Sequence, residues 1–239
     1  MRAETLQKHI VATYFSLRVA LAFAAFALPL LLWVGGRFYG VALQDSMSAY
    51  YHATTSGLCP SGGGVMRDWF VGVLFAVGAL LYAYRGYSDL ENITLNIAGV
   101  LAIGIALFPM KVTCEHPDAT FTPHGTCAFG FFICIAFVCV VCAPNTLPAM
   151  RNPPLERRYK RAYRIIGAVM LGSPGAAVLV SILLQRYQPH LFAIEMFGIY
   201  AFAVFWALKS YEIKQSQADH RAARGELQTD PRSRELVGV

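Results

Sequence analysis

Apolar and polar residues alternate along this chain in long blocks, not at the short intervals of a soluble domain. Six runs are almost free of charge and are bounded by polar residues; they cover about 19–36, 68–85, 92–110, 127–144, 165–185 and 190–208. At 1.5 Å per residue, such runs approach or exceed the roughly 30 Å of a bilayer's hydrocarbon core. They lack the period-two alternation of a transmembrane barrel. The pattern predicts an all-α, polytopic bundle of six transmembrane helices.

The segments between the runs complete this organisation. Residues 1–215 form the predicted six-helix transmembrane domain, and residues 216–239 are expected to form a polar, unstructured cytoplasmic tail. The loop between the first two helices is long, and its stretch 41–54 contains neither Gly nor Pro. As a helix, this stretch places Asp45, Ser48 and His52 on one face. We therefore expect a structured outer loop.

Composition supports a membrane protein. Of 239 residues, 56% are hydrophobic and only 14% are charged, whereas soluble domains carry about 25% charged residues. The net charge of +6 comes from cations beside the apolar runs, with no basic stripe interleaved with aromatic residues. Nucleic acid is therefore excluded as a partner, and the expected partner is the lipid bilayer.

The distribution of cations predicts the orientation. Sixteen Lys and Arg residues fall in the tails and even-numbered loops, and four fall in the odd-numbered loops. The positive-inside rule then places both termini in the cytoplasm. A cleaved signal peptide is the alternative interpretation of the first run. Its long flank and the lack of a small-x-small cleavage site favour a retained helix.

Titratable residues gather in the predicted outer segments. Glu195 lies inside the sixth run, where an unpaired carboxylate costs ~2.5–3.5 kcal/mol at the bilayer centre. His52, His124 and Glu195 form a predicted ligand set for zinc or a similar divalent ion, with Asp68 as base or orienter of a metal-bound water. The alternative is a hydrogen-bonded cluster that fixes the outer loop. Ser48 activated by His52 is a lower-ranked nucleophile hypothesis.

Three cysteines also lie in outer segments: Cys59, Cys114 and Cys127. Oxidising conditions there permit a disulfide, most simply between Cys114 and Cys127. The odd number leaves one thiol over, so the pairing stays open.

A short motif resembles a known family. The sequence Ser48-Ala49-Tyr50-Tyr51-His52, followed by Asp68, resembles the Ser-x-x-x-His…Asp part of the membrane-embedded CREST hydrolases. The resemblance implies that His52 is a zinc ligand and that Ser48 and Asp68 surround the activated water. This chain has six predicted spans, whereas that superfamily has seven and a His-x-x-x-His pair in the last. As a whole, the chain looks more like the uncharacterised multi-pass families of the bacterial inner membrane.

These observations lead to one main expectation and two alternatives. The main expectation is an integral membrane protein with an outward-facing polar, metal-binding pocket for a lipid or small molecule. It would act as a metal-dependent hydrolase of lipid-like esters or amides. The alternatives are a transporter or receptor-like binding module, in which Glu195 grips a cation, and an accessory subunit without chemistry.

Overall fold

The computed structural model describes residues 3–54, 64–110, 122–184 and 189–227. Every regular element in these ranges is helical. The elements are α1 (Ala3–Leu30), the π-helix η1 (Leu31–Gly35), α2 (Gly36–Phe38), the 3₁₀ helix η2 (Ser48–Tyr51), α3 (Arg67–Ala83), α4 (Asp89–Leu107), α5 (Pro123–Phe137), the π-helix η3 (Val138–Cys142), the 3₁₀ helix η4 (Ala143–Met150), α6 (Pro153–Leu184), α7 (Pro189–Ser216) and α8 (Ala218–Ala223).

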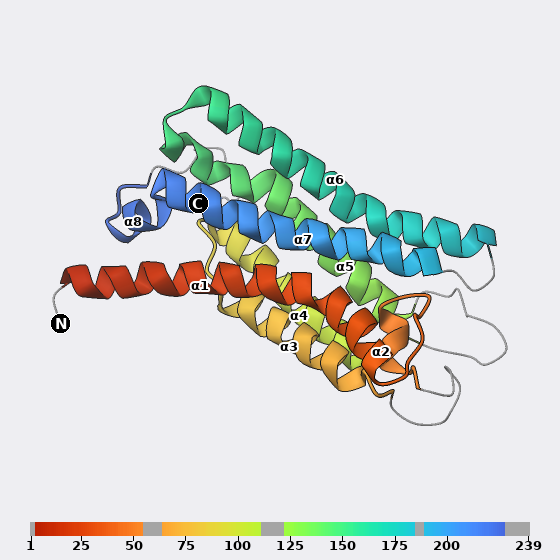
Figure 1. Ribbon diagram of the computed structural model, residues 1–239. Helices are drawn as coiled ribbons and strands as arrows, with labels where there is room; N and C mark the ends of the chain where they lie inside the picture. The colour runs from red at the N-terminus through yellow and green to blue at the C-terminus, as the bar shows by residue number, and fades with distance from the viewer. Residues whose placement is uncertain (1–2, 55–63, 111–121, 185–188, 228–239) are drawn as a thin grey trace.

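The six long helices form a ring in chain order. Each of α1, α3, α4, α5, α6 and α7 packs against the next, and α7 returns to pack against α1 (Figure 1). The short helix α8 contacts α1 and α7 near the place where α1 begins; we call this end of the bundle the α8 end. The opposite end holds η2 and the first turns of α3 and α5, and we call it the loop end. The ring encloses the hydrophobic core.

Five helical stretches are long and apolar enough to cross a membrane: Thr5–Phe38, Asp89–Leu107, Pro123–Met150, Pro153–Val180 and Leu191–Ser216. Their outer faces carry large apolar side chains such as Phe23 and Leu179, which are exposed on the protein surface. Such a surface is stable when hydrocarbon covers it. The described residues therefore confirm the prediction of an all-helical chain with several helices suited to cross a membrane. Helix α3, with 17 residues, is not one of these five.

The first and last helices extend well beyond the predicted runs. Helix α1 begins at Ala3, whereas its apolar run begins near residue 19. The predicted tail opens with α8, which packs onto α1. Arg18 of α1, which is 1% exposed, pairs with Asp219 of α8 at 2.5 Å and so ties α8 to α1. Residues 228–239 of the predicted tail lie outside the described residues.

The helix predicted over residues 41–54 is wrong. Gly40 has a φ of 72°, and the chain then runs without regular structure until η2. Local side-chain bonds compete with a helix here: Gln44 donates to the carbonyl of Ala42, and the Ser46 hydroxyl accepts the amide of Ala49. In the described part of this loop, Asp45, Ser48 and His52 therefore do not share a helix face.

Hydroxyl residues define where two of the helices begin. Thr122 caps α5 by accepting the amide of Gly125 at 3.2 Å, and Pro123 occupies the first turn. Ser88 caps α4 by accepting the amide of Glu91, whose carboxylate in turn accepts the amide of Tyr87. This reciprocal arrangement is close to a capping box. The cap of α5 places His124 in the first turn of that helix, next to the end of α4.

Helices α3 and α4 approach most closely at two glycines. A Cβ atom added at Gly78 or at Gly99 would lie 2.7 Å from the backbone oxygen of the other residue. We expect Gly99→Leu to force the helices apart and to destabilise the protein by roughly 1–3 kcal/mol. Gly72→Leu, at a position on α3 with no atom within 4 Å, is the matched control. Thermal unfolding in detergent measures both; equal melting temperatures would contradict this packing.

Candidate functional site

A cavity of about 240 Å³ lies inside the ring, toward the loop end. All six long helices and the loop before η2 contribute to its lining, which is apolar except for four side chains: Ser48, His124, Ser173 and Glu195. A cavity of about 150 Å³ already accommodates a benzene molecule. This cavity is therefore large enough for part of an apolar ligand, with polar groups to orient it.

Ser48 and His124 form a hydrogen-bonded pair in this cavity. The Ser48 hydroxyl lies 2.8 Å from Nε2 of His124. Nδ1 of the same ring lies 2.8 Å from the carbonyl oxygen of Phe108 and 3.2 Å from that of Ile105. Carbonyl oxygens only accept hydrogen bonds, so Nδ1 carries a hydrogen.

The tautomer determines what the pair can do. His124 is 7% exposed in an apolar environment, which disfavours the charged imidazolium. In the neutral ring with its hydrogen on Nδ1, Nε2 accepts and Ser48 donates. This is the relation between a serine nucleophile and its histidine base, with the Phe108 carbonyl in the place of the group that orients the base.

Glu195 holds the chain just before Ser48. Its Oε2 accepts the backbone amide of Met47 at 2.8 Å. Met47 is the residue before η2, so this bond links α7 to the loop that carries Ser48. The carboxylate thereby obtains one partner for its buried oxygen and also lines the cavity. Ser48, His124 and Glu195, which come from three distant segments of the chain, all line this cavity.

Two predicted site residues lie elsewhere. His52 donates through Nε2 to the carbonyl of Met110 at 2.8 Å and does not line the cavity. The side chain of Asp68 is 89% exposed and pairs with Arg67 at 3.4 Å. The family resemblance implied that Asp68 lies beside Ser48, and the structure does not place it there.

No ligand set for zinc is assembled by the described residues. Among them, no group of three or more His, Cys, Asp or Glu side chains is arranged to hold a metal ion. The Nε2 atom of His52 is hydrogen-bonded to one backbone carbonyl oxygen. The Nδ1 atom of His124 is hydrogen-bonded to two other carbonyl oxygens. These residues as arranged do not form a zinc site. Cys127 is a free cysteine, so its predicted disulfide with Cys114 is wrong. Cys59 and Cys114 themselves lie outside the described residues.

A second polar cluster lies at the α8 end. Lys209 of α7, 2% exposed, donates to Oε2 of Glu212, to the Thr146 hydroxyl and to the Ala143 carbonyl at 2.7–2.8 Å. Glu212, fully buried, also accepts from Tyr163 at 3.0 Å and from Thr146 at 2.9 Å. This cluster ties α7 to η4 and α6.

The α8 end contains a further buried ion pair. Arg18 donates to both carboxylate oxygens of Asp219, and the Tyr87 hydroxyl also donates to that carboxylate. Burial raises the pKa of the Tyr87 hydroxyl above its ordinary value, so it remains a protonated donor. The guanidinium of Arg18 also lies 5.9 Å from the centre of the Tyr84 ring. These contacts fasten α8 to α1 and to the loop before α4.

The sequence analysis did not predict these two polar clusters, because it assigned the Lys and Arg residues beside the apolar runs only to the orientation of the chain in the membrane. The sequence did contain one indication of the first cluster. Lys209 and Glu212 are three residues apart, and opposite charges at this spacing lie on the same face of a helix and can pair. The pairing of Ser48 with His124 had no such signal, since 76 residues separate them. Comparison with models of protein families, with curated proteins and with solved structures finds no match for this chain.

Proposed function

We propose that this protein is a membrane-embedded serine hydrolase that cleaves a lipid-like ester. The observation that carries the proposal is the Ser48–His124 hydrogen bond at the polar end of an apolar cavity. The apolar lining suits an acyl chain, and the pair suits attack on a carbonyl group beside that chain. The proposal keeps the expected substrate class and replaces the metal-bound water with a serine nucleophile.

The reaction follows from the two side chains. Ser48 Oγ bonds to the ester carbonyl carbon, and His124 Nε2 takes the hydroxyl proton and gives it to the departing alcohol. The acyl group is then attached to Ser48. A water molecule, deprotonated by the same nitrogen, attacks the acyl carbon; the released Ser48 oxygen regains a proton, and a carboxylic acid leaves. Phe108 keeps the ring in the tautomer that both steps need.

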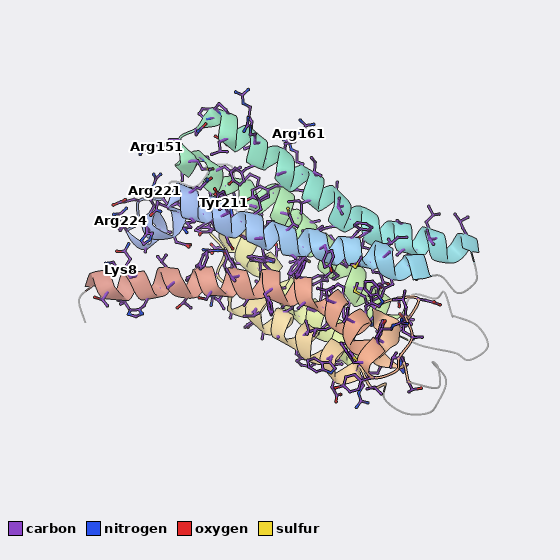
Figure 2. All side chains as sticks on the ribbon, viewed as in Figure 1. Lys8, Arg151, Arg161, Tyr211, Arg221 and Arg224 are labelled. Carbon is purple, nitrogen blue, oxygen red and sulfur yellow. The ribbon has the colours of Figure 1, made fainter. Side chains whose placement is uncertain are left out.

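The proposed topology has six spans. Helix α3, at 17 residues, reaches about 26 Å, which is at the short limit for a membrane span. Figure 2 shows Lys8, Arg151, Arg221 and Arg224 gathered at the α8 end. The positive-inside rule then puts the α8 end on the cytoplasmic side of a bacterial inner membrane. The cavity, near the loop end, then lies toward the outer side.

A fluorophosphonate probe tests the proposal, because it forms a covalent bond with a serine that has an activating base. We expect the purified protein in detergent to be labelled at Ser48, and Ser48→Ala to remove the label. Ser46→Ala is the matched control: the Ser46 hydroxyl accepts the Ala49 amide, and Ser46 does not line the cavity. Labelling that persists in Ser48→Ala, or fails in the native chain, would overturn the proposal.

A binding or transport protein without chemistry is the second candidate. The observation that favours it is Glu195, an acid that lines the cavity and is held by the Met47 amide. An intramembrane carboxylate of this kind often marks a ligand or ion pathway. This candidate predicts saturable lipid binding or flux that is lost in Glu195→Gln, together with no probe labelling at Ser48.

A further inference from the structure

The first turns of α6 carry three cations without an acid partner. Arg158, Arg161 and Arg164 are exposed, and none forms a hydrogen bond or an ion pair with another residue in the described ranges. Glu156 is the only acid between residues 119 and 194, and its carboxylate pairs with Lys160 at 2.9 Å. No acid of this segment is thus left to neutralise the three guanidinium groups.

The elements with the main contacts to α6 do not supply a carboxylate either. These are α5, η3, η4 and α7, and the first three contain neither Asp nor Glu. Helix α7 contains two acids. Glu212 is fully buried and pairs with Lys209, and Glu195 accepts the Met47 amide beside the cavity. The described residues around α6 therefore leave its positive charge unneutralised.

These cations lie where α6 changes from polar to apolar. Arg164 is the last charged residue of the helix, and the next residue, Ile165, is 55% exposed. Arg161 and Arg158 lie about 4.5 and 9 Å from Arg164 along the helix, on the side away from the apolar stretch. The headgroup region adds about 5–8 Å to each side of a bilayer's hydrocarbon core. With Ile165 at the hydrocarbon boundary, the three cations lie at the depth of the lipid phosphates.

The same side of α6 continues as an apolar strip. Figure 2 shows Arg161 on the outer side of this helix. Arg161, Ile165 and Val169 follow one another at a spacing of four residues, so they lie on one side of the helix. Ile165 and Val169 are both exposed. A cationic end followed by exposed hydrocarbon matches a phospholipid, which has a charged phosphate and an apolar chain.

Charge complementarity decides between the occupants of this face. In a two-fold contact with a second copy in the same bilayer, the arginines of both copies would lie at the same depth, and like charges brought together are unfavourable. A free phosphate ion pairs with the arginines but leaves the apolar strip uncovered. A phospholipid with net negative charge satisfies both parts of the face.

We infer that Arg158, Arg161, Arg164, Ile165 and Val169 bind an anionic phospholipid on the outer face of α6. The guanidinium groups donate their forked N–H groups to the headgroup phosphate. Ile165 and Val169 contact the first part of an acyl chain. This site lies at the α8 end, whereas the cavity lies toward the loop end. The inference therefore goes beyond the proposed function and does not depend on it.

Equilibrium binding of two phospholipids to the protein in a maltoside detergent tests the inference. The probes are dioleoylphosphatidylglycerol, which is anionic, and dioleoylphosphatidylcholine, which has the same chains and no net charge. We expect the native protein to bind the anionic lipid about tenfold more tightly. The variant Arg158→Gln/Arg161→Gln/Arg164→Gln should bring the ratio of the two dissociation constants close to one.

A second triple variant separates a local site from general charge attraction. Arg85→Gln/Lys214→Gln/Arg224→Gln removes the same number of exposed cations on or beside α7 and α8. We expect this control to keep most of the preference for the anionic lipid. Gel filtration and thermal unfolding check that both variants are folded.

The outcomes identify the occupant of the face. Equal affinities of the native protein for the two lipids, or equal loss of preference in both triple variants, would overturn the inference. Displacement of the lipid by inorganic phosphate, beyond that by sodium chloride at the same ionic strength, would assign the arginines to free phosphate and also overturn it. Self-association that displaces the lipid would do the same in favour of a second copy. Loss of preference in the α6 variant alone supports the inference, whether or not Ser48 reacts with a fluorophosphonate.

Discussion

Replacing His124 with alanine is expected to lower kcat for ester hydrolysis by about 10²–10⁴-fold, the usual contribution of a general base. The physical reason is that Ser48 loses the acceptor that lies 2.8 Å from its hydroxyl. Steady-state hydrolysis of a p-nitrophenyl ester of medium chain length, followed in detergent, measures the effect.

His52→Ala is the informative control for this experiment. His52 bonds the Met110 carbonyl and does not line the cavity, so its loss should leave kcat within about twofold of the native value. The zinc hypothesis makes the opposite prediction, because it treats His52 and His124 as equivalent ligands. Equal losses in the two variants would therefore contradict the serine mechanism.

The second large effect concerns stability. Lys209→Met leaves Glu212 buried without its cation, and removal of one partner from a buried ion pair costs about 3–5 kcal/mol. The double variant Lys209→Met/Glu212→Gln removes both charges and should recover a substantial part of that loss. Unfolding by a denaturing detergent, followed by circular dichroism, gives the free energies of unfolding.

Lys214→Met supplies the matched control, since Lys214 is an exposed residue on the same helix. We expect it to change the free energy of unfolding by less than about 0.5 kcal/mol. A single Lys209→Met variant as stable as the native protein, or a double variant less stable than the single one, would show that the pair does not fix α7 to its neighbours.

The fold was predictable where apolar patterning alone decides it. Each of the six runs falls within or largely overlaps a long helix of the structure. The helix ends were less predictable, because side-chain contacts determine them. The Arg18–Asp219 pair accompanies the extension of α1 toward the N-terminus and of the helical region into α8, and neither residue is apolar. Hydropathy places such charged turns outside the membrane and says nothing about their structure.

The candidate site was predictable only in part: three of its residues could be identified from the sequence, whereas His52 and Asp68 lie away from the cavity. Glu195 was identified because an acid in an apolar run is costly, and His124 because it opens one. Ser48 was paired with His52 by spacing, whereas the structure pairs it with His124 across 76 residues. The failed helix over 41–54 explains this difference. Only a helix would have put Ser48 and His52 on one face, and local hydroxyl and amide bonds prevent it.

The ring closure has a consequence for synthesis in the cell. Helix α7 both supplies Glu195 and completes the wall against α1. A chain that has formed only its first five long helices has no α7 between α6 and α1, so its cavity lacks the wall that carries Glu195. The cavity is therefore complete only when the last long helix has packed against the first.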